Sequence, residues 1–144
     1  MKNRIVVDAN ILFSALLKKG NPYIKVLMNA NCKFFGPTFV FIELFKHKEK
    51  IQKYSSLSEE ELLELLGIVL DQIEFISLKE IDKRILKQSY ELAIIDPLDA
   101  PFVALSLFLD AKLWTGDKKL CRYLECKGFD ICIGTQELLQ SLYV

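Results

Sequence analysis

The chain lacks the residues from which structural zinc sites are usually built. Its 144 residues include one histidine, His47, and four cysteines without a Cys-x-x-Cys pair, namely Cys32, Cys121, Cys126 and Cys132. A zinc site normally needs several such ligands at close spacing, so this inventory argues against one. We expect four reduced, mostly buried thiols that bind no metal, as is usual for a cytoplasmic protein.

Long apolar runs are also absent. The longest uncharged apolar stretch, residues 100–109, has about half the length that a membrane-spanning helix requires. Near the N-terminus, Asp8 and Asn10 interrupt the apolar run that a signal peptide would need. We therefore expect a cytoplasmic protein without membrane contact.

Linkers and repeats are not found either. No segment rich in proline, glycine and serine divides the sequence, and no internal repeat is visible. Apolar residues make up 51% of the chain and charged residues 26%, a balance typical of globular proteins and not of disordered or fibrous ones. The length fits one domain, and we expect residues 1–144 to form it.

The net charge of zero hides an uneven distribution. Residues 1–57 hold ten basic and three acidic residues, whereas residues 58–74 hold six acidic residues and no basic one. The N-terminal excess of positive charge is compatible with a nucleic-acid partner, although the chain as a whole is neutral.

Short apolar runs alternate with helical patterns along the chain. We expect strands at residues 5–7, 33–35, 74–78, 112–114 and 130–133. The helical patterns cover residues 9–18, 22–30, 38–53, 79–94, 100–109, 118–127 and 136–143, and a capping box at Ser58 and Glu61 opens an acidic helix. This alternation predicts an α/β fold with a mostly parallel sheet.

Acidic residues fall where such a sheet would bind a ligand. Asp8 follows the first strand, Asp117 follows the strand at 112–114, and Asp99 starts the helix that leads into that strand. Ligands of parallel sheets bind outside the carboxyl ends of the strands. Glu43 lies on the apolar stripe of its helix, where a carboxylate is costly unless it is paired or bound to a cation. We also expect Trp114, three residues before Asp117, to be buried near this edge.

Ordinary structural roles explain each acid taken singly. Asp99 and Asp117 stand where helix N-caps are expected, and Asp8 could begin a turn. Glu43 has Lys46 and His47 within one helical turn, so a local ion pair would account for it. Their joint placement at one sheet edge favours a shared role.

Converging carboxylates repel one another, and a hard divalent cation relieves that repulsion. Oxygen-rich sites suit Mg²⁺ or Mn²⁺, and these ions can activate water to attack a phosphate ester. The residues alone therefore indicate metal-assisted hydrolysis of a phosphate ester without identifying the substrate.

Four features follow one another along the chain: IVVDANIL at residues 5–12, Glu43, DPLDAPFVAL at residues 96–105, and LWTGD at residues 113–117. These features resemble the PIN-domain family, most closely the VapC-like toxins and related PIN-domain ribonucleases. Each is weak alone, but together, in this order and at this spacing, they are fairly specific. The resemblance spans nearly the whole chain.

This resemblance implies a single α/β/α sandwich with the sheet order 3-2-1-4-5 and a Mg²⁺- or Mn²⁺-dependent endoribonuclease. It also implies the toxin component of a toxin–antitoxin pair, with RNA, an antitoxin protein and a second copy of the chain as partners. The residues that match the acidic quartet of the family, as catalytic residues and metal ligands, are Asp8, Glu43, Asp99 and Asp117. Positions that often support that quartet correspond to Asn10, Asp96 and Thr115.

Basic residues close to these acids could contact RNA phosphates. They follow Glu43 and Asp117 in the sequence and comprise Lys46, Lys48, Lys50, Lys53, Lys118, Lys119 and Arg122. Solvated helix faces are the alternative explanation for each of them.

Two other functions compete with this interpretation. A phosphatase with an aspartyl nucleophile would want a second acid two residues after Asp8, where this chain has Asn10, and a capping module for which 144 residues leave little room. The other is a catalytically silent PIN-like module that only binds RNA or a protein, against which the complete acidic quartet argues.

Overall fold

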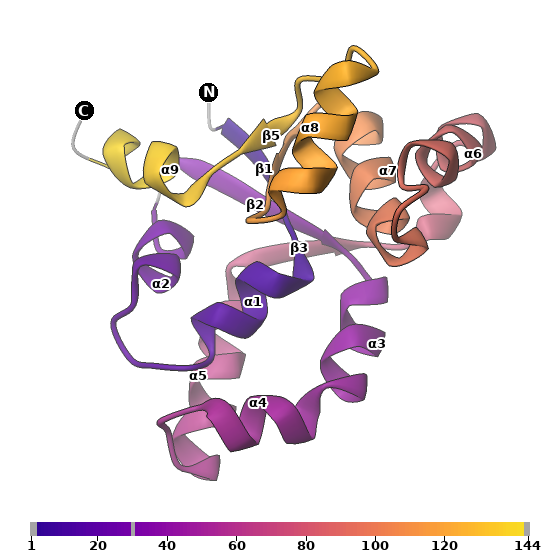
Figure 1. Ribbon diagram of the computed structural model, residues 1–144. Coiled ribbons are helices and arrows are strands. Elements are labelled where there is room, and N and C mark those ends of the chain that lie inside the picture. Colours follow the sequence, from indigo (N-terminus) through magenta and orange to yellow (C-terminus); the bar gives the residue numbers. More distant parts are fainter. Residues whose placement is uncertain (1–2, 30, 143–144) are drawn as a thin grey trace.

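A five-stranded parallel sheet in the order β3-β2-β1-β4-β5 forms the centre of the molecule (Figure 1). The computed structural model describes residues 3–29 and 31–142. The strands are β1 (Asn3–Val7), β2 (Cys32–Pro37), β3 (Ile73–Ile76), β4 (Lys112–Trp114) and β5 (Cys132–Ile133). The α/β class and the strand order that the motif resemblance implied are both confirmed.

Helices flank the sheet on both sides. They are α1 (Ala9–Ala15), α2 (Pro22–Leu27), α3 (Phe39–Lys46), α4 (Lys48–Tyr54), α5 (Glu59–Asp71), α6 (Lys83–Leu92), α7 (Ala100–Leu109), α8 (Lys118–Cys126) and α9 (Thr135–Ser141). Two short 3₁₀ turns, η1 (Leu78–Glu80) and η2 (Pro97–Asp99), precede α6 and α7. In the described residues, no helix combines the length and the apolar character that crossing a bilayer requires.

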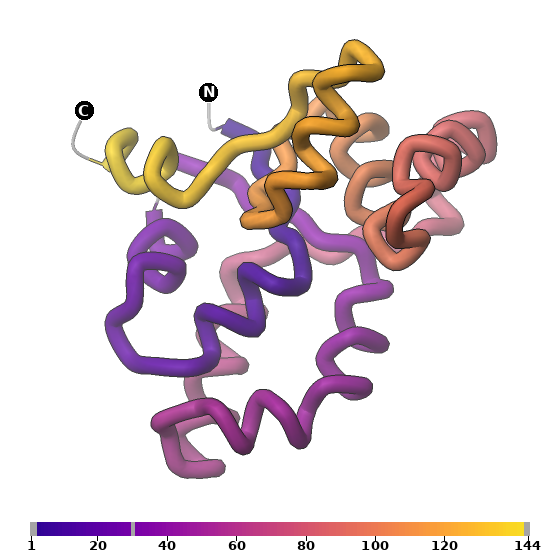
Figure 2. The backbone as a smooth tube through the Cα atoms, viewed as in Figure 1, coloured from indigo at the N-terminus to yellow at the C-terminus, as the bar shows by residue number. Residues whose placement is uncertain are grey.

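The packing follows from the apolar patterns. The side chains of Val6 and Val7 in β1 and of Leu113 in β4 are fully buried because both strands lie inside the sheet. Helix α7 is apolar on all sides, and it packs on β1, β2 and β4 while α6 covers its outer side. Figure 2 shows α9, near the C-terminus, beside α2 from the first third of the chain, and residue contacts join these two helices.

Several predicted boundaries differ from the structure. The helix expected at 38–53 is two helices, because the backbone departs from helical geometry at His47 (φ −106°, ψ 13°). The helix expected at 79–94 is shorter, since η1 occupies its first turn and α6 begins only after Asp82, which caps it. The predicted helix ends at Ala30 and Tyr143 lie outside the described residues.

The expectation of four reduced cysteines is wrong for two of them. Cys121 of α8 and Cys132 of β5 form a disulfide, with Cα atoms 5.9 Å apart. Because β5 pairs with β4 directly beside α8, these two residues come within bridging reach without any chelating sequence spacing. Cys32 and Cys126 are free, the first buried and the second exposed, and burial raises the pKa of the Cys32 thiol.

Candidate functional site

The ends of β1 and β4 bring two of the predicted acids together. Val7 pairs with Trp114 in register, and the Asp8 backbone N–H donates to the Trp114 carbonyl at 3.1 Å. The residues that follow each strand therefore begin side by side. Trp114 is fully buried, as expected, and its indole Nε1 donates to Thr135 Oγ1 at 3.0 Å.

Thr115 connects Asp8 to Asp117. Its hydroxyl donates to Asp8 Oδ2 at 2.8 Å and accepts the backbone N–H of Asp117 at 3.1 Å. Both Thr115 and Asp8 are about 95% buried. The hydroxyl thereby fixes the Asp8 carboxylate and the start of α8 in one arrangement.

The Asp8 carboxyl lies in an environment that disfavours its charge. Burial raises the pKa of Asp8 above its ordinary value, and the negative charges of Asp117 and Glu43 raise it further. The hydrogen bonds from Thr115 and from the backbone N–H of Ala9, the latter at 2.9 Å, oppose this rise. A positive ion beside the carboxylate would relieve the same penalty.

Glu43 on α3 is buried with one oxygen unsatisfied. Its side chain is 8% exposed, and Oε2 lies 3.5 Å from His47 Nε2, one helical turn further on. Oε1 has no hydrogen-bond partner among the described residues. Pairing with His47 thus gives a partner to only one of the two carboxylate oxygens. A buried oxygen without a partner needs a further explanation.

Asp99 does not act as the helix cap that its position suggested. The described part of the chain offers no capping hydrogen bond to its side chain, whereas Asp96 and Asp117 accept the N–H groups of Leu98 and Leu120. The cap interpretation therefore holds for Asp117 but not for Asp99.

The charges around Asp99 show that the acids converge. Burial raises the pKa of Asp99 to about 7, and the charges of Asp8, Asp96, Asp117 and Glu43 add to the effect, in that order. A carboxyl that is half protonated near neutral pH is unusual and typical of functional sites.

The acids line two adjoining hollows. The first has a volume of about 170 Å³, and its polar lining consists of Asp8, Asn10, Glu43, His47, Asp96 and Asp99. The second, of about 50 Å³, is lined by Asp96, Asp99 and Asp117 together with Lys119. The structure therefore brings all four predicted acids, with Asn10, Asp96 and Thr115, to one edge of the sheet.

These residues fit a hard divalent cation in their donor chemistry. All the acidic side chains offer oxygen, and the buried Glu43 Oε1 lacks a protein partner. Within residues 3–29 and 31–142, no three His, Cys, Asp or Glu side chains form a ready-made metal cage. Mg²⁺ is commonly held by one or two carboxylates and keeps several waters, so the site suits this ion without such a cage.

The predicted RNA-contacting lysines separate into two groups. Lys119 lines the smaller acidic hollow, and Lys50 lines a further hollow that adjoins the larger one. Lys46, Lys48 and Lys118 are exposed on α3, α4 and α8 but line neither acidic hollow.

Sequence reasoning missed one part of the site. His47 was considered only as an ion-pair partner of Glu43, yet it lines the larger acidic hollow, as does Phe13. The rings of Phe13 and His47 contact each other edge to face at 5.4 Å between centroids. The spacing of Asn10 and Phe13, one helical turn apart, was the available signal, since it puts both on one face of α1.

Comparison with solved structures agrees with the fold. A structure described as "Crystal structure of PAE2754 from Pyrobaculum aerophilum" matches with a TM-score of 0.68 over 98% of this chain and 90% of that one. The two sequences are only 16% identical, so this likeness concerns the fold. A search among curated proteins gives no significant match.

The sequence itself matches the family described as "PIN domain" over residues 6–129. That range includes all four acids and Thr115. PIN domains are in general nucleases, which supports hydrolysis of phosphodiesters as the class of activity. The chain belongs to the PIN-domain family.

Proposed function

We propose that this chain is a Mg²⁺- or Mn²⁺-dependent endoribonuclease. The observation that carries the proposal is the buried Glu43 carboxylate. Its Oε1 has no hydrogen-bond partner among the described residues, and Glu43 lines the same hollow as Asp8 and Asp99. A protein with no use for a cation would gain stability by replacing such a residue, because an unsatisfied buried carboxylate oxygen is costly.

Each acid has a distinct part in this proposal. Thr115 holds Asp8 in place, His47 orients Glu43 through Oε2, and the α8 N-terminus positions Asp117 through Leu120. Asp99 has its side chain free to turn toward a ligand. When bound, a divalent cation would lower the pKa of a water molecule and supply the nucleophile for attack on phosphorus.

The substrate in this proposal is single-stranded RNA. Its phosphates would meet Lys119 on one side of the acids and Lys50 on the other, while Lys46, Lys48 and Lys118 would contact more distant phosphates. Asn10 and Asp96 line the larger hollow and would orient the quartet or the substrate.

The toxin role rests on the resemblance of the four motifs to VapC-like toxins. In this proposal the chain is cytoplasmic, forms a homodimer and is held inactive by an antitoxin protein. Large apolar side chains on α3, among them Ile42 at 57% and Phe45 at 72% exposure, offer a surface for such partners. An upstream reading frame whose product rescues growth when both are expressed would support this role.

Two measurements test the nuclease proposal. Titration calorimetry with Mn²⁺ should show binding, and single-stranded RNA should be cleaved with Mg²⁺ or Mn²⁺ but not with EDTA. Glu43→Gln should abolish both, whereas Glu49→Gln, on the exposed surface of α4, should change neither. Binding of RNA without any binding of Mn²⁺ would instead indicate the catalytically silent module.

A further inference from the structure

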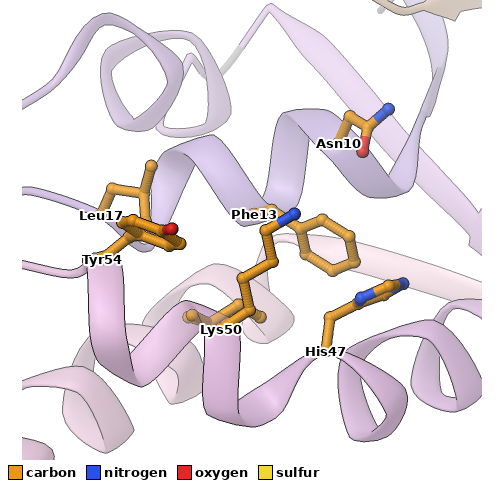
Figure 3. Close-up of a pocket in the computed structure, with 7 residues that line it drawn as sticks. Asn10, Phe13, Leu17, His47, Lys50 and Tyr54 are labelled. Atoms are coloured by element: carbon orange, nitrogen blue, oxygen red, sulfur yellow. The ribbon is translucent and has the colours of Figure 1, made fainter.

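A third hollow, called here the ring-lined hollow, lies beside the larger acidic one, between α1 and α4 (Figure 3). Its volume is about 240 Å³. Leu17 and Ile51 contribute aliphatic side chains to its lining, and the rings of Phe13, His47 and Tyr54 stand around it. This volume is below the roughly 300–1,000 Å³ of pockets for drug-sized ligands, so it suits a single small ring system.

The ring-lined hollow and the larger acidic hollow adjoin each other. Asn10, Phe13 and His47 line both of them. A nucleic-acid strand with a phosphate at the carboxylates would therefore have a neighbouring nucleotide within reach of the ring-lined hollow.

The chemistry of the lining differs from that of the acidic hollow. None of the described residues around the ring-lined hollow is acidic, and Lys50 extends from α4 across it toward α1 (Figure 3). Tyr54 is 60% exposed, although its ring is large and mostly apolar. An exposed aromatic ring next to a cation is a combination on which bases of single strands stack.

We propose that this hollow is a nucleobase subsite, in which Phe13, His47 and Tyr54 hold the base next to the scissile phosphodiester. Lys50 contacts the phosphate of that nucleotide. This inference rests on the proposed ribonuclease function, and it adds that substrate choice depends on one unpaired base beside the cut. An apolar side chain of a protein partner suits the hollow less well, because Lys50 and Asn10 would stay unpaired against it.

Binding in EDTA tests the subsite separately from cleavage. A fluorescent single-stranded RNA is made with one abasic nucleotide, moved through every position in turn, and its affinity is measured at low salt. We expect one position at which the abasic change lowers affinity roughly 5- to 150-fold, the loss of one base stacked on aromatic rings.

Variants of Tyr54 link that position to the hollow. Tyr54→Ala should lower the affinity for intact RNA by a similar factor. In this variant, the abasic change at that position should have no further effect on affinity. Tyr54→Phe keeps the ring and should bind like the wild type, as should Tyr90→Ala, a matched change of another half-exposed tyrosine on α6. Thermal melts check that each variant is folded.

Other outcomes overturn the proposal. A flat abasic scan, equal effects of Tyr54→Ala and Tyr90→Ala, or no RNA binding at all would exclude a base subsite. With a flat scan and intact cleavage, the nuclease proposal stands and the hollow takes a protein segment instead. If one abasic position lowers the affinity but no metal-dependent cleavage is found, the base subsite stands and the nuclease proposal is refuted.

Discussion

One hydroxyl group, that of Thr115, holds two acidic residues in register. By donating to Asp8 and accepting from the Asp117 backbone, it joins the ends of β1 and β4. The Asp8 carboxylate is satisfied by Thr115 and Ala9 in the absence of metal, whereas Glu43 is only half satisfied. The fold therefore provides partners for both oxygens of the Asp8 carboxylate but for only one oxygen of the Glu43 carboxylate.

Replacing Asp8 with asparagine separates function from stability. We expect Asp8→Asn to abolish metal-dependent RNA cleavage while leaving the metal-free protein as stable or more stable, by about 1 kcal/mol, because one repelling charge is removed. Cleavage assays and thermal melts with EDTA measure the two effects. Asp110→Asn, which removes a charge before β4 at the opposite edge of the sheet, should leave cleavage intact. Wild-type cleavage by Asp8→Asn would refute the site.

Asp99 predicts a pH dependence of stability. Its pKa rises from 3.8 to about 7 on folding, so between these values the folded chain keeps a proton that the unfolded chain releases. The free energy of unfolding of the metal-free protein should therefore lose a contribution as pH rises from about 4 to about 7. Relative to wild type, Asp99→Asn should gain about 1–2 kcal/mol over this range, less than the full shift because the group is partly solvated.

Denaturant unfolding of both proteins in EDTA at several pH values measures this difference. It should be near zero at pH 4 and level off above pH 7. A difference that stays constant over the range would show that Asp99 does not experience the other acids.

For single residues, the sequence predicts the place of an acidic side chain in the fold better than the groups that surround it. Asp8 and Asp117 could be placed because each directly follows a strand whose pattern is clear. The unsatisfied oxygen of Glu43 could not be foreseen, because it depends on how α3 packs against α1 and α7. The missing cap at Asp99 was equally hidden, since η2 already gives its backbone helical geometry (φ −77°, ψ −21°), unlike the extended backbone of a usual N-cap.

Among the elements, β4 is short but deeply placed. Its Trp114 is fully buried and packs near Phe34 and Tyr23, with ring centroids 6.0 and 6.3 Å away. We expect blue-shifted emission from the metal-free protein and a change in emission on adding Mn²⁺, because Thr115 and Asp117 follow on the same segment. Asp8→Asn should abolish the Mn²⁺ response. Emission typical of an exposed indole would contradict the placement of β4.

The disulfide between α8 and β5 joins two cysteines that are eleven positions apart in the sequence. A loop of this size stabilises a fold by about 2–3 kcal/mol through the unfolded chain, so reduction should lower the free energy of unfolding by that amount. Melts with and without dithiothreitol measure it, and Cys121→Ser should be insensitive to the reagent. Disulfides are rare in reducing compartments, so the presence of this bridge is worth measuring directly. Mass spectrometry of the chain, purified without reductant, shows whether Cys121 and Cys132 are joined. Two free thiols there would refute the bridge.

The break between α3 and α4 shows a limit of periodicity. Residues 38–53 keep helical spacing throughout, and nothing in their composition forbids one long helix. A continuous helix would carry Lys50, Ile51 and Tyr54 away from α1, whereas the bend at His47 turns α4 back so that Ile51 is buried. Long-range packing thus decides the geometry at a point where the local sequence is neutral.

Over the whole molecule, charge is separated even though the total is zero. The acidic helix α5 is tied to the basic N-terminal third by an ion pair between Glu61 and Lys19, which lowers the pKa of Glu61 to about 2. Basic side chains on α3 and α4 remain exposed. Global composition could not reveal this surface, but the order of charges along the chain did.

That surface predicts a strong salt dependence of RNA binding. Replacing Lys46, Lys48 and Lys50 with glutamine should lower the slope of log affinity against log salt by about one unit for each lost phosphate contact. Replacing three exposed lysines away from the site with glutamine should leave the slope unchanged. These control residues are Lys25, Lys33 and Lys112. Equal slopes for both triple variants would place the RNA elsewhere.

The parallel topology also sets when this site can come into being. Asp8 emerges from the ribosome first, and its partner strand β4 and Asp117 follow only after about a hundred further residues have been made. Because β4 adds beside β1 and leads directly to Asp117, no shorter length of the nascent chain can assemble the four acids. A growing chain is surrounded by messenger, transfer and ribosomal RNA. The order of its strands keeps the acidic residues apart until β4 and Asp117 have left the ribosome.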